Sequence, residues 1–116
     1  MMRPFECSTE LMGGVTVLRI TGELDATDAP VVWRALDSGI ASTGCVVIDL
    51  SGCDFIDSSG IASIVQAWQG SDGAESRGKV LLAGPRGQVE RIIKVTGLDQ
   101  HIAIFDEVEQ AVASVP

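Results

Sequence analysis

The chain has 116 residues, 46% of them hydrophobic, which is enough for one domain around a single core. Eight Lys and Arg against 16 Asp and Glu give a net charge of −8, which argues against direct binding of nucleic acid and leaves room for a basic or mixed protein partner. The three cysteines, Cys7, Cys45 and Cys53, lack the paired spacing of a disulfide framework or a zinc site, so we interpret Cys45 and Cys53 as buried free thiols. No apolar run is long enough for a membrane span or a signal peptide. We therefore expect one cytoplasmic domain over residues 1–116, with no membrane insertion, no metal and no cofactor.

The first predicted unit is a β-hairpin. Residues 15–21 are rich in β-forming side chains and follow a Gly-Gly turn, so residues 4–10 are the expected partner strand. In the next segment, DATDAPVVWRALDSGI, either Asp28 or Thr27 can cap a helix whose apolar residues recur every three or four positions. The continuous apolar run CVVIDL, residues 45–50, then predicts a strand buried on both faces, which favours a parallel sheet.

The middle of the chain predicts another helix and strand. From Gly60 onward, apolar residues fall at i, i+3, i+4 and i+7, which is one face of a helix. Residues 69–78, rich in Gly and Ser, form a connection to a short strand at residues 79–84.

The C-terminal part predicts two helices separated by a strand. PRGQVERIIKVTGL is helical, with Gly97 as its left-handed C-terminal cap. A short strand follows at residues 101–105, and Asp106 with Glu109 predicts a capping box for the last helix.

This order of elements predicts an α/β fold. Strands alternating with helices indicate right-handed crossovers and a mostly parallel central sheet, with an antiparallel N-terminal hairpin and four helices. Functional groups gather beyond the carboxyl ends of the strands in such sheets. We expect three loops to meet there, at residues 23–28, 51–60 and 84–87.

The segment DSSG, residues 57–60, is the strongest candidate for a functional site. Asp and Ser side chains are favoured N-caps, but one helix needs only one of them, so Asp57, Ser58 and Ser59 are redundant as caps. A serine at this place is also well disposed to carry a phosphate, because the free N–H groups and the helix dipole favour an anion. Spacing alone leaves both readings open.

A hydrolase is the less favoured interpretation of these serines. Activation of Ser58 or Ser59 needs a nearby base, and the only histidine, His101, is predicted at the start of a strand, at the opposite end of a parallel sheet. The GxSxG elbow is also missing. We therefore expect no catalytic activity.

Two other phosphate-related patterns are weak. Asp49 could suggest the phosphoacceptor of a response-regulator receiver domain, but Asp25 and Asp28 are poor candidates for its magnesium-binding pair, and the hairpin start argues against that fold. The GPRGQV segment has two glycines and no lysine to grip a phosphate, so we interpret it as a turn into a helix.

A family resemblance is carried by three segments in this order and spacing: GELDATDAP, VVIDLSGCDFIDSSGIASIV and VTGLDQHIAIFDEVEQAV. Together they resemble a STAS domain, and among STAS domains the small bacterial anti-sigma-factor antagonists. The resemblance implies a switch by partner exchange. In that family the unphosphorylated antagonist binds an anti-sigma factor that is also a serine kinase, which frees a sigma factor for transcription. Phosphorylation by the kinase releases the antagonist, and a PP2C-type phosphatase resets it.

The resemblance also implies roles for individual residues. By position, Ser58 is the phosphorylated serine, directly after Asp57. Asp25 matches an acidic position beside that serine, and Ser59 and Gly60 shape the same loop, so these five residues form the implied partner-binding site.

Two alternatives stay open for a chain of this family. The domain could be the STAS subunit of a membrane lipid-transport ATPase complex, in which the serine need not be modified. It could also sense a small ligand in a pocket beyond the strand ends.

Overall fold

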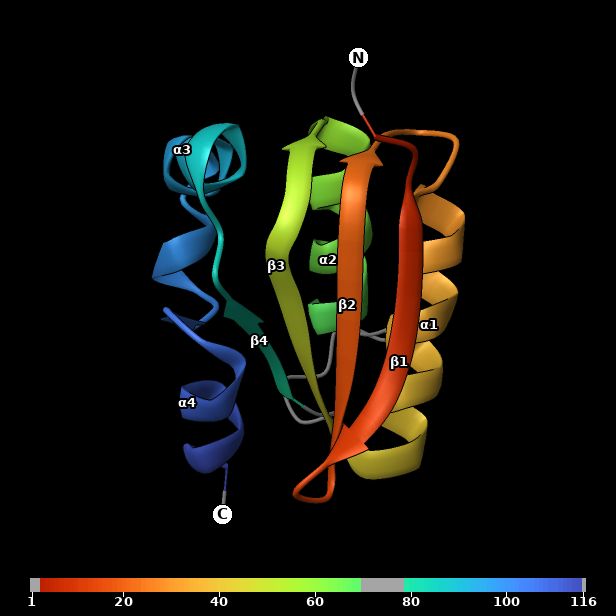
Figure 1. Ribbon diagram of the computed structural model, residues 1–116, viewed down its shortest axis with the longest axis vertical. Coiled ribbons are helices and arrows are strands. Elements are labelled where there is room, and N and C mark those ends of the chain that lie inside the picture. The colour runs from red at the N-terminus through yellow and green to blue at the C-terminus, as the bar shows by residue number, and fades with distance from the viewer. Residues whose placement is uncertain (1–2, 70–78, 116) are drawn as a thin grey trace.

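The computed structural model describes residues 3–69 and 79–115, which form a five-stranded sheet flanked by helices (Figure 1). The elements in chain order are β1 (Glu6–Met12), β2 (Val15–Leu24), α1 (Ala29–Thr43), β3 (Cys45–Ile56), α2 (Ser58–Gln69), β4 (Lys79–Ala83), α3 (Gly87–Thr96), the 3-10 helix η1 (Leu98–Gln100), β5 (Ile104–Phe105) and α4 (Val108–Ala113). The strands lie in the order β1-β2-β3-β4-β5, with β1 antiparallel to β2 and the other neighbouring pairs parallel. The predicted α/β fold, with its N-terminal hairpin and four α-helices in the described residues, is confirmed.

The larger core lies between the sheet and helices α1, α2 and α3. In Figure 1, α1 and α2 lie behind the strands. The apolar face of α1 contributes Val32, Leu36 and Ile40, and that of α2 contributes Ile61 and Ile64; all of them are buried. These helices form because their apolar residues recur with helical spacing and meet the β-branched and leucine side chains of the central strands.

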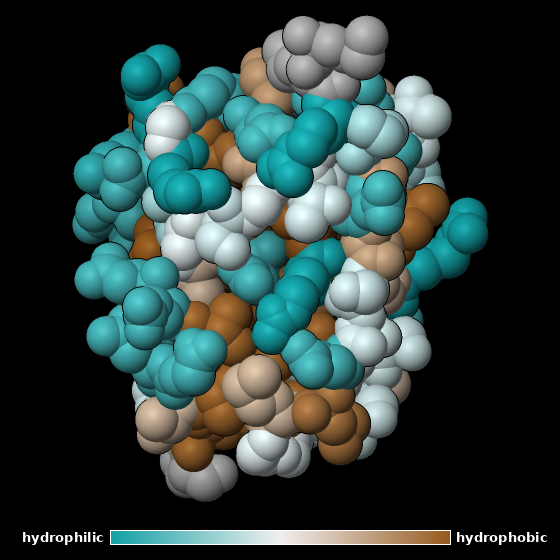
Figure 2. Space-filling view, in the orientation of Figure 1, coloured by the Kyte–Doolittle hydropathy of each residue, from teal (hydrophilic) through white to brown (hydrophobic). Residues whose placement is uncertain are grey.

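The opposite face of the sheet is covered only in part. Helix α4 packs Val108 and Ala111 on Val17 and Val47, near the start of the parallel strands. Figure 2 shows this face, where apolar side chains gather at the lower end and hydrophilic side chains lie over the middle and upper parts. In the last part of β3, Ser51 and Asp54 are exposed. None of the helices in the described part of the chain has both the length and the apolar composition needed to cross a membrane.

Strands β2 and β3 are longer than predicted. The sequence placed the end of β2 before Gly22 and a loop from Ser51 to Gly60, whereas β2 reaches Leu24 and β3 reaches Ile56. The two strands stay paired because irregularities in their register, on either side of Gly22, absorb extra residues. The loop predictions were therefore wrong for residues 23–24 and 51–56, which are strand, and for residues 58–60, which begin α2.

The C-terminal elements also differ in detail from the prediction. Residues 101–103 are not strand, because η1 takes up the chain just before them and β5 is only Ile104–Phe105. The capping box is formed by Glu107 and Gln110, one residue later than predicted. Gly97 does provide the left-handed C-cap of α3, with φ of 75°. The connection predicted over residues 69–78 lies, from residue 70 on, outside the described residues.

Gly22 should be the costliest glycine to replace in the hairpin. Its φ of 79° is left-handed, and an added Cβ would collide with the backbone carbonyl of Pro4. Gly44 has nearly the same φ, 78°, but its Cβ would meet no atom within 4 Å. In urea unfolding we expect Gly44→Ala to cost about 1 kcal/mol and Gly22→Ala about 3 kcal/mol or more. Equal losses would contradict the steric argument.

Candidate functional site

The parallel pairing of β2 and β3 brings two carboxylate residues to one edge of the sheet. Leu24 is paired with Ile56, and the next residue of each chain segment is an aspartate, Asp25 and Asp57. The backbone N–H of Asp57 donates to the carbonyl oxygen of Leu24 at 3.2 Å. The structure thus places Asp25, directly after the end of β2, beside the start of α2, as expected for the carboxyl ends of parallel strands.

Asp57 caps α2. One carboxylate oxygen of Asp57 accepts from the backbone N–H of Gly60 at 3.0 Å, and its carbonyl oxygen accepts from Ile61 N–H at 3.1 Å. Ser58 is the first residue of the helix and is exposed, whereas Ser59 is half-buried. Within residues 3–69 and 79–115, neither serine hydroxyl makes a hydrogen bond. Of the three residues that could cap α2, Asp57 is therefore the one that does. The hydroxyl of Ser58 is not used for capping.

Gly60 lets the first turn of α2 approach the strand ends. It is buried, and a Cβ at this position would lie 2.6 Å from Cγ1 of Ile56 and 3.0 Å from Cγ of Leu24. Only a residue without a side chain fits this contact. Gly60 therefore fixes where the helix begins relative to both strands.

Asp25 organises the loop that leads into α1. Its carboxylate accepts from the backbone N–H of Thr27 at 3.0 Å, and its carbonyl oxygen accepts from the N–H groups of Asp28 and Ala29. Asp28 occupies the N-cap position of α1, but its side chain makes no capping hydrogen bond, so the predicted capping by Asp28 or Thr27 was wrong. Burial, followed by the neighbouring charge of Asp25, raises the pKa of Asp28. The edge thus carries closely spaced acidic groups.

An open groove of about 530 Å³ runs between α1 and α2 from this edge. Its lining includes the aromatic ring of Trp33, the cationic side chain of Arg34 and the half-buried Ser59. The groove therefore begins one residue away from Ser58.

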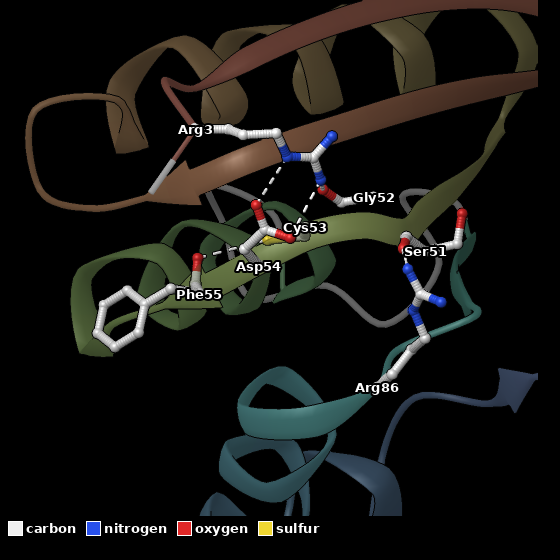
Figure 3. A network of polar contacts seen from close by, with 7 residues as sticks. All are labelled: Arg3, Ser51, Gly52, Cys53, Asp54, Phe55 and Arg86. Carbon is white, nitrogen blue, oxygen red and sulfur yellow. Dashed lines mark hydrogen bonds and ion pairs between the residues drawn. The ribbon is translucent and has the colours of Figure 1, made fainter. Parts of the chain in front are cut away.

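Two arginines hold the end of β3 from its two sides (Figure 3). Arg3 makes two hydrogen bonds to the Asp54 carboxylate, at 2.9 and 3.0 Å, and one to the carbonyl oxygen of Gly52 at 2.7 Å. The hydrogen bonds from Arg3 lower the pKa of Asp54. Arg86 donates to the carbonyl oxygen of Ser51 at 2.6 Å.

The side chain of Gln88, from α3, binds the last residue of β3. Its carbonyl oxygen accepts from Ile56 N–H at 3.0 Å, and its amide donates to the Ile56 carbonyl oxygen at 2.9 Å. Sequence reasoning missed the contacts of Arg3, Arg86 and Gln88. For Arg86 and Gln88, the sequence did offer a signal. Both are polar residues of GPRGQV, which follows the strand at residues 79–84 at the end of the sheet where the site was predicted.

Comparison with known proteins identifies the family. A model of the STAS domain matches residues 7–111. The chain belongs to the STAS domain family. A relative in Paenibacillus polymyxa, an anti-sigma F factor antagonist, is 27% identical over 95 residues, which cover 80% of each chain. The crystal structure of an anti-sigma factor antagonist from Mycobacterium paratuberculosis is similar, with a TM-score of 0.80 and 28% identity, over 97% of this chain and 94% of that one. Phosphorylated SpoIIAA from Bacillus shares the fold, with a TM-score of 0.70 and 18% identity, over 97% of this chain and all (100%) of that one.

His101 and Asp49, considered above for a hydrolase and for a receiver domain, lie away from the start of α2. His101 is exposed after η1, with its ring 5.6 Å from that of Trp68. Asp49 lies inside β3, where its carboxylate accepts from the N–H and hydroxyl of Ser51 and lies 3.5 Å from Arg19. In the described ranges no group of three or more His, Cys, Asp or Glu side chains could hold a metal ion.

The three cysteines of the domain are free thiols. Cys45 and Cys53 are buried, which confirms the sequence interpretation, and Cys7 is half-buried. Burial raises the pKa of Cys53 to about 11 and also raises the pKa values of the other two thiols. Thiolates are the reactive species, so all three are held in their less reactive form at neutral pH.

Removal of the Asp57 cap should loosen the start of α2. We expect Asp57→Ala to lower the free energy of unfolding in urea by about 1 kcal/mol, because the N–H of Gly60 loses its acceptor. Asp57→Asn is the matched control, since it keeps a capping oxygen without the charge, and it should cost only a few tenths of a kcal/mol. An equal loss in both variants would show that the charge of Asp57, and not its cap, stabilises the helix.

Proposed function

We propose that this STAS domain is an anti-sigma factor antagonist. In its unphosphorylated form it binds an anti-sigma factor that has serine kinase activity, and this releases a sigma factor. Phosphorylation of Ser58 ends the binding, and a PP2C-type phosphatase restores it. The chain acts in the cytoplasm as a binding partner, without catalysing a reaction, inserting into a membrane or contacting nucleic acid.

The observation that carries the proposal is the state of Ser58. It is exposed at the first position of α2, and Asp57 supplies the cap that the serine would otherwise provide. Asp25, Ser59 and Gly60 lie in the segments around it. The similarity of four-fifths of the chain to an anti-sigma F factor antagonist supports the same conclusion.

The fold is suited to carry a phosphate at Ser58. The first N–H groups of a helix lack intrahelical acceptors, and together with the helix dipole they favour an anion. The carboxylates of Asp57 and Asp25, at the same sheet edge, oppose this effect. A phosphate adds about −1.5 to −2 charge near neutral pH, so its main consequence is a changed binding surface rather than an unfolded domain.

Phosphorylation should depend on Ser58 alone. We expect incubation with ATP and the cognate anti-sigma factor kinase to add one phosphate to the wild-type chain by intact mass, and none to Ser58→Ala. Ser59→Ala is the matched control. It should still be modified, because the side chain of Ser59 is half-buried along the groove and is not the proposed phosphate acceptor. A wild-type chain that is neither modified nor bound by the kinase would refute the proposal.

A charge at position 58 should weaken binding without unfolding the domain. We expect Ser58→Glu to bind the kinase at least about tenfold more weakly by calorimetry, while its free energy of unfolding changes by less than about 1 kcal/mol. Ser58→Gln adds similar bulk without charge, so it separates the steric effect from the electrostatic one. A severe loss of stability in Ser58→Glu would contradict the argument that the helix terminus accepts an anion.

A further inference from the structure

Strand β3 extends well beyond its partner β4. The two strands pair from Cys45 opposite Lys79 to Asp49 opposite Ala83, whereas β3 continues to Ile56. In the described residues, the last part of β3 therefore has a strand neighbour only on the β2 side. On the side of β3 that has no neighbouring strand, the backbone N–H and C=O groups need other hydrogen-bond partners.

The GPRGQ segment supplies these partners. A Cβ added to Gly84 would lie 3.0 Å from Cβ of Ser51, so the segment passes close to β3. Arg86 then donates to the Ser51 carbonyl oxygen, as Figure 3 shows, and Gln88 binds both backbone groups of Ile56. The segment thus takes over from β4 as the neighbour of β3.

Glutamine is suited to the position next to Ile56. A primary amide carries an acceptor and a donor at one end of the side chain, as a peptide group does. Gln88 uses both on one residue, at 3.0 and 2.9 Å, and is itself half-buried. Its side chain therefore replaces the missing strand at this point of the ladder.

Ile56 connects this contact to the start of α2. Its buried side chain packs where a Cβ of Gly60 would be, and the next residue, Asp57, binds Leu24 through its N–H and caps the helix through its carboxylate. We propose that Gln88 is a positioning residue that holds the first turn of α2, and with it the hydroxyl of Ser58, in the conformation that a partner recognises. The claim about recognition rests on the proposed function, whereas the claim about the helix turn does not.

Amide hydrogen exchange tests the first claim on the isolated chain. In Gln88→Leu we expect exchange at Asp57, Gly60 and Ile61 to be roughly tenfold faster, although the acceptors of these three N–H groups belong to Leu24 and Asp57 and not to Gln88. Gln88→Glu keeps the size and the acceptor but loses the donor, so it should accelerate the same amides without creating a cavity. Unchanged exchange at these amides in both variants would overturn the proposal.

Gln100→Leu is the matched control. Gln100 is exposed, and its side chain makes no hydrogen bond within the described parts of the chain, so its replacement should leave exchange at the start of α2 unchanged. Exchange at Val17, in the hairpin, should stay constant in every variant. Faster exchange at Val17 as well would indicate a global loss of stability and would overturn a local role for Gln88.

Phosphorylation kinetics test the second claim. With the cognate kinase, we expect kcat/KM for Ser58 to fall roughly tenfold in Gln88→Leu and to be unchanged in Gln100→Leu. Equal rates in wild type and Gln88→Leu would overturn the link to Ser58 and leave the proposed function standing. A wild-type chain that is neither phosphorylated nor bound by the kinase would instead refute the proposed function, and the exchange result would still decide whether Gln88 holds the helix turn.

Discussion

The continued pairing of β2 with β3 is the constraint on which the rest of the site depends. The ladder runs past Gly22 to Leu24 and Ile56 because register irregularities let both strands continue beyond the point where β3 loses β4. If β2 had ended before Gly22, Asp25 and Asp57 would have lain on two separate loops with no strand pairing between them. Instead, the N–H of Asp57 is bound directly to the Leu24 carbonyl, so two chain segments share one rigid edge.

At this end of the sheet, the helix cap and the exposed serine hydroxyl belong to different residues, which the sequence alone did not decide. A helix start that presents a serine needs a cap, and a hydroxyl that serves as the cap is engaged with the backbone N–H groups of the first turn. Asp57 accepts the hydrogen bond from Gly60, which leaves Ser58 one residue further on, exposed and at the positive end of the helix dipole. The helix is thus stabilised by a group that modification would not remove. Under the proposed function, phosphorylation of Ser58 would therefore change the surface while the structure beneath it persists.

Local patterns predicted most of the fold, and the errors occurred where distant segments decide the local structure. Helix faces were readable because burial follows a period of 3.6 residues. The sequence around Ser51 and Gly52 is typical of a turn, yet pairing with β2 keeps it in a strand. The sequence predicted that Asp25 and Asp57 lie together at the carboxyl ends of the strands, as the structure has them, but the contacts of Arg3 and Gln88 with β3 were missed. These side chains act on residues more than 30 positions away, and no local pattern records such contacts.

The acidic character of the edge limits how phosphorylation could end binding. A basic partner would be attracted by an added phosphate, so charge repulsion alone would not release it. Release follows if the hydroxyl of Ser58 is buried in the complex, because taking a phosphate dianion out of water costs more than a nearby cation returns unless the geometry is made for it. Ser58 is exposed in the free chain and lies one residue from the groove between α1 and α2, so a partner that occupied this groove would cover it. Under the proposed function, the exposure that gives a kinase access to Ser58 would thus also make its phosphate incompatible with the bound state.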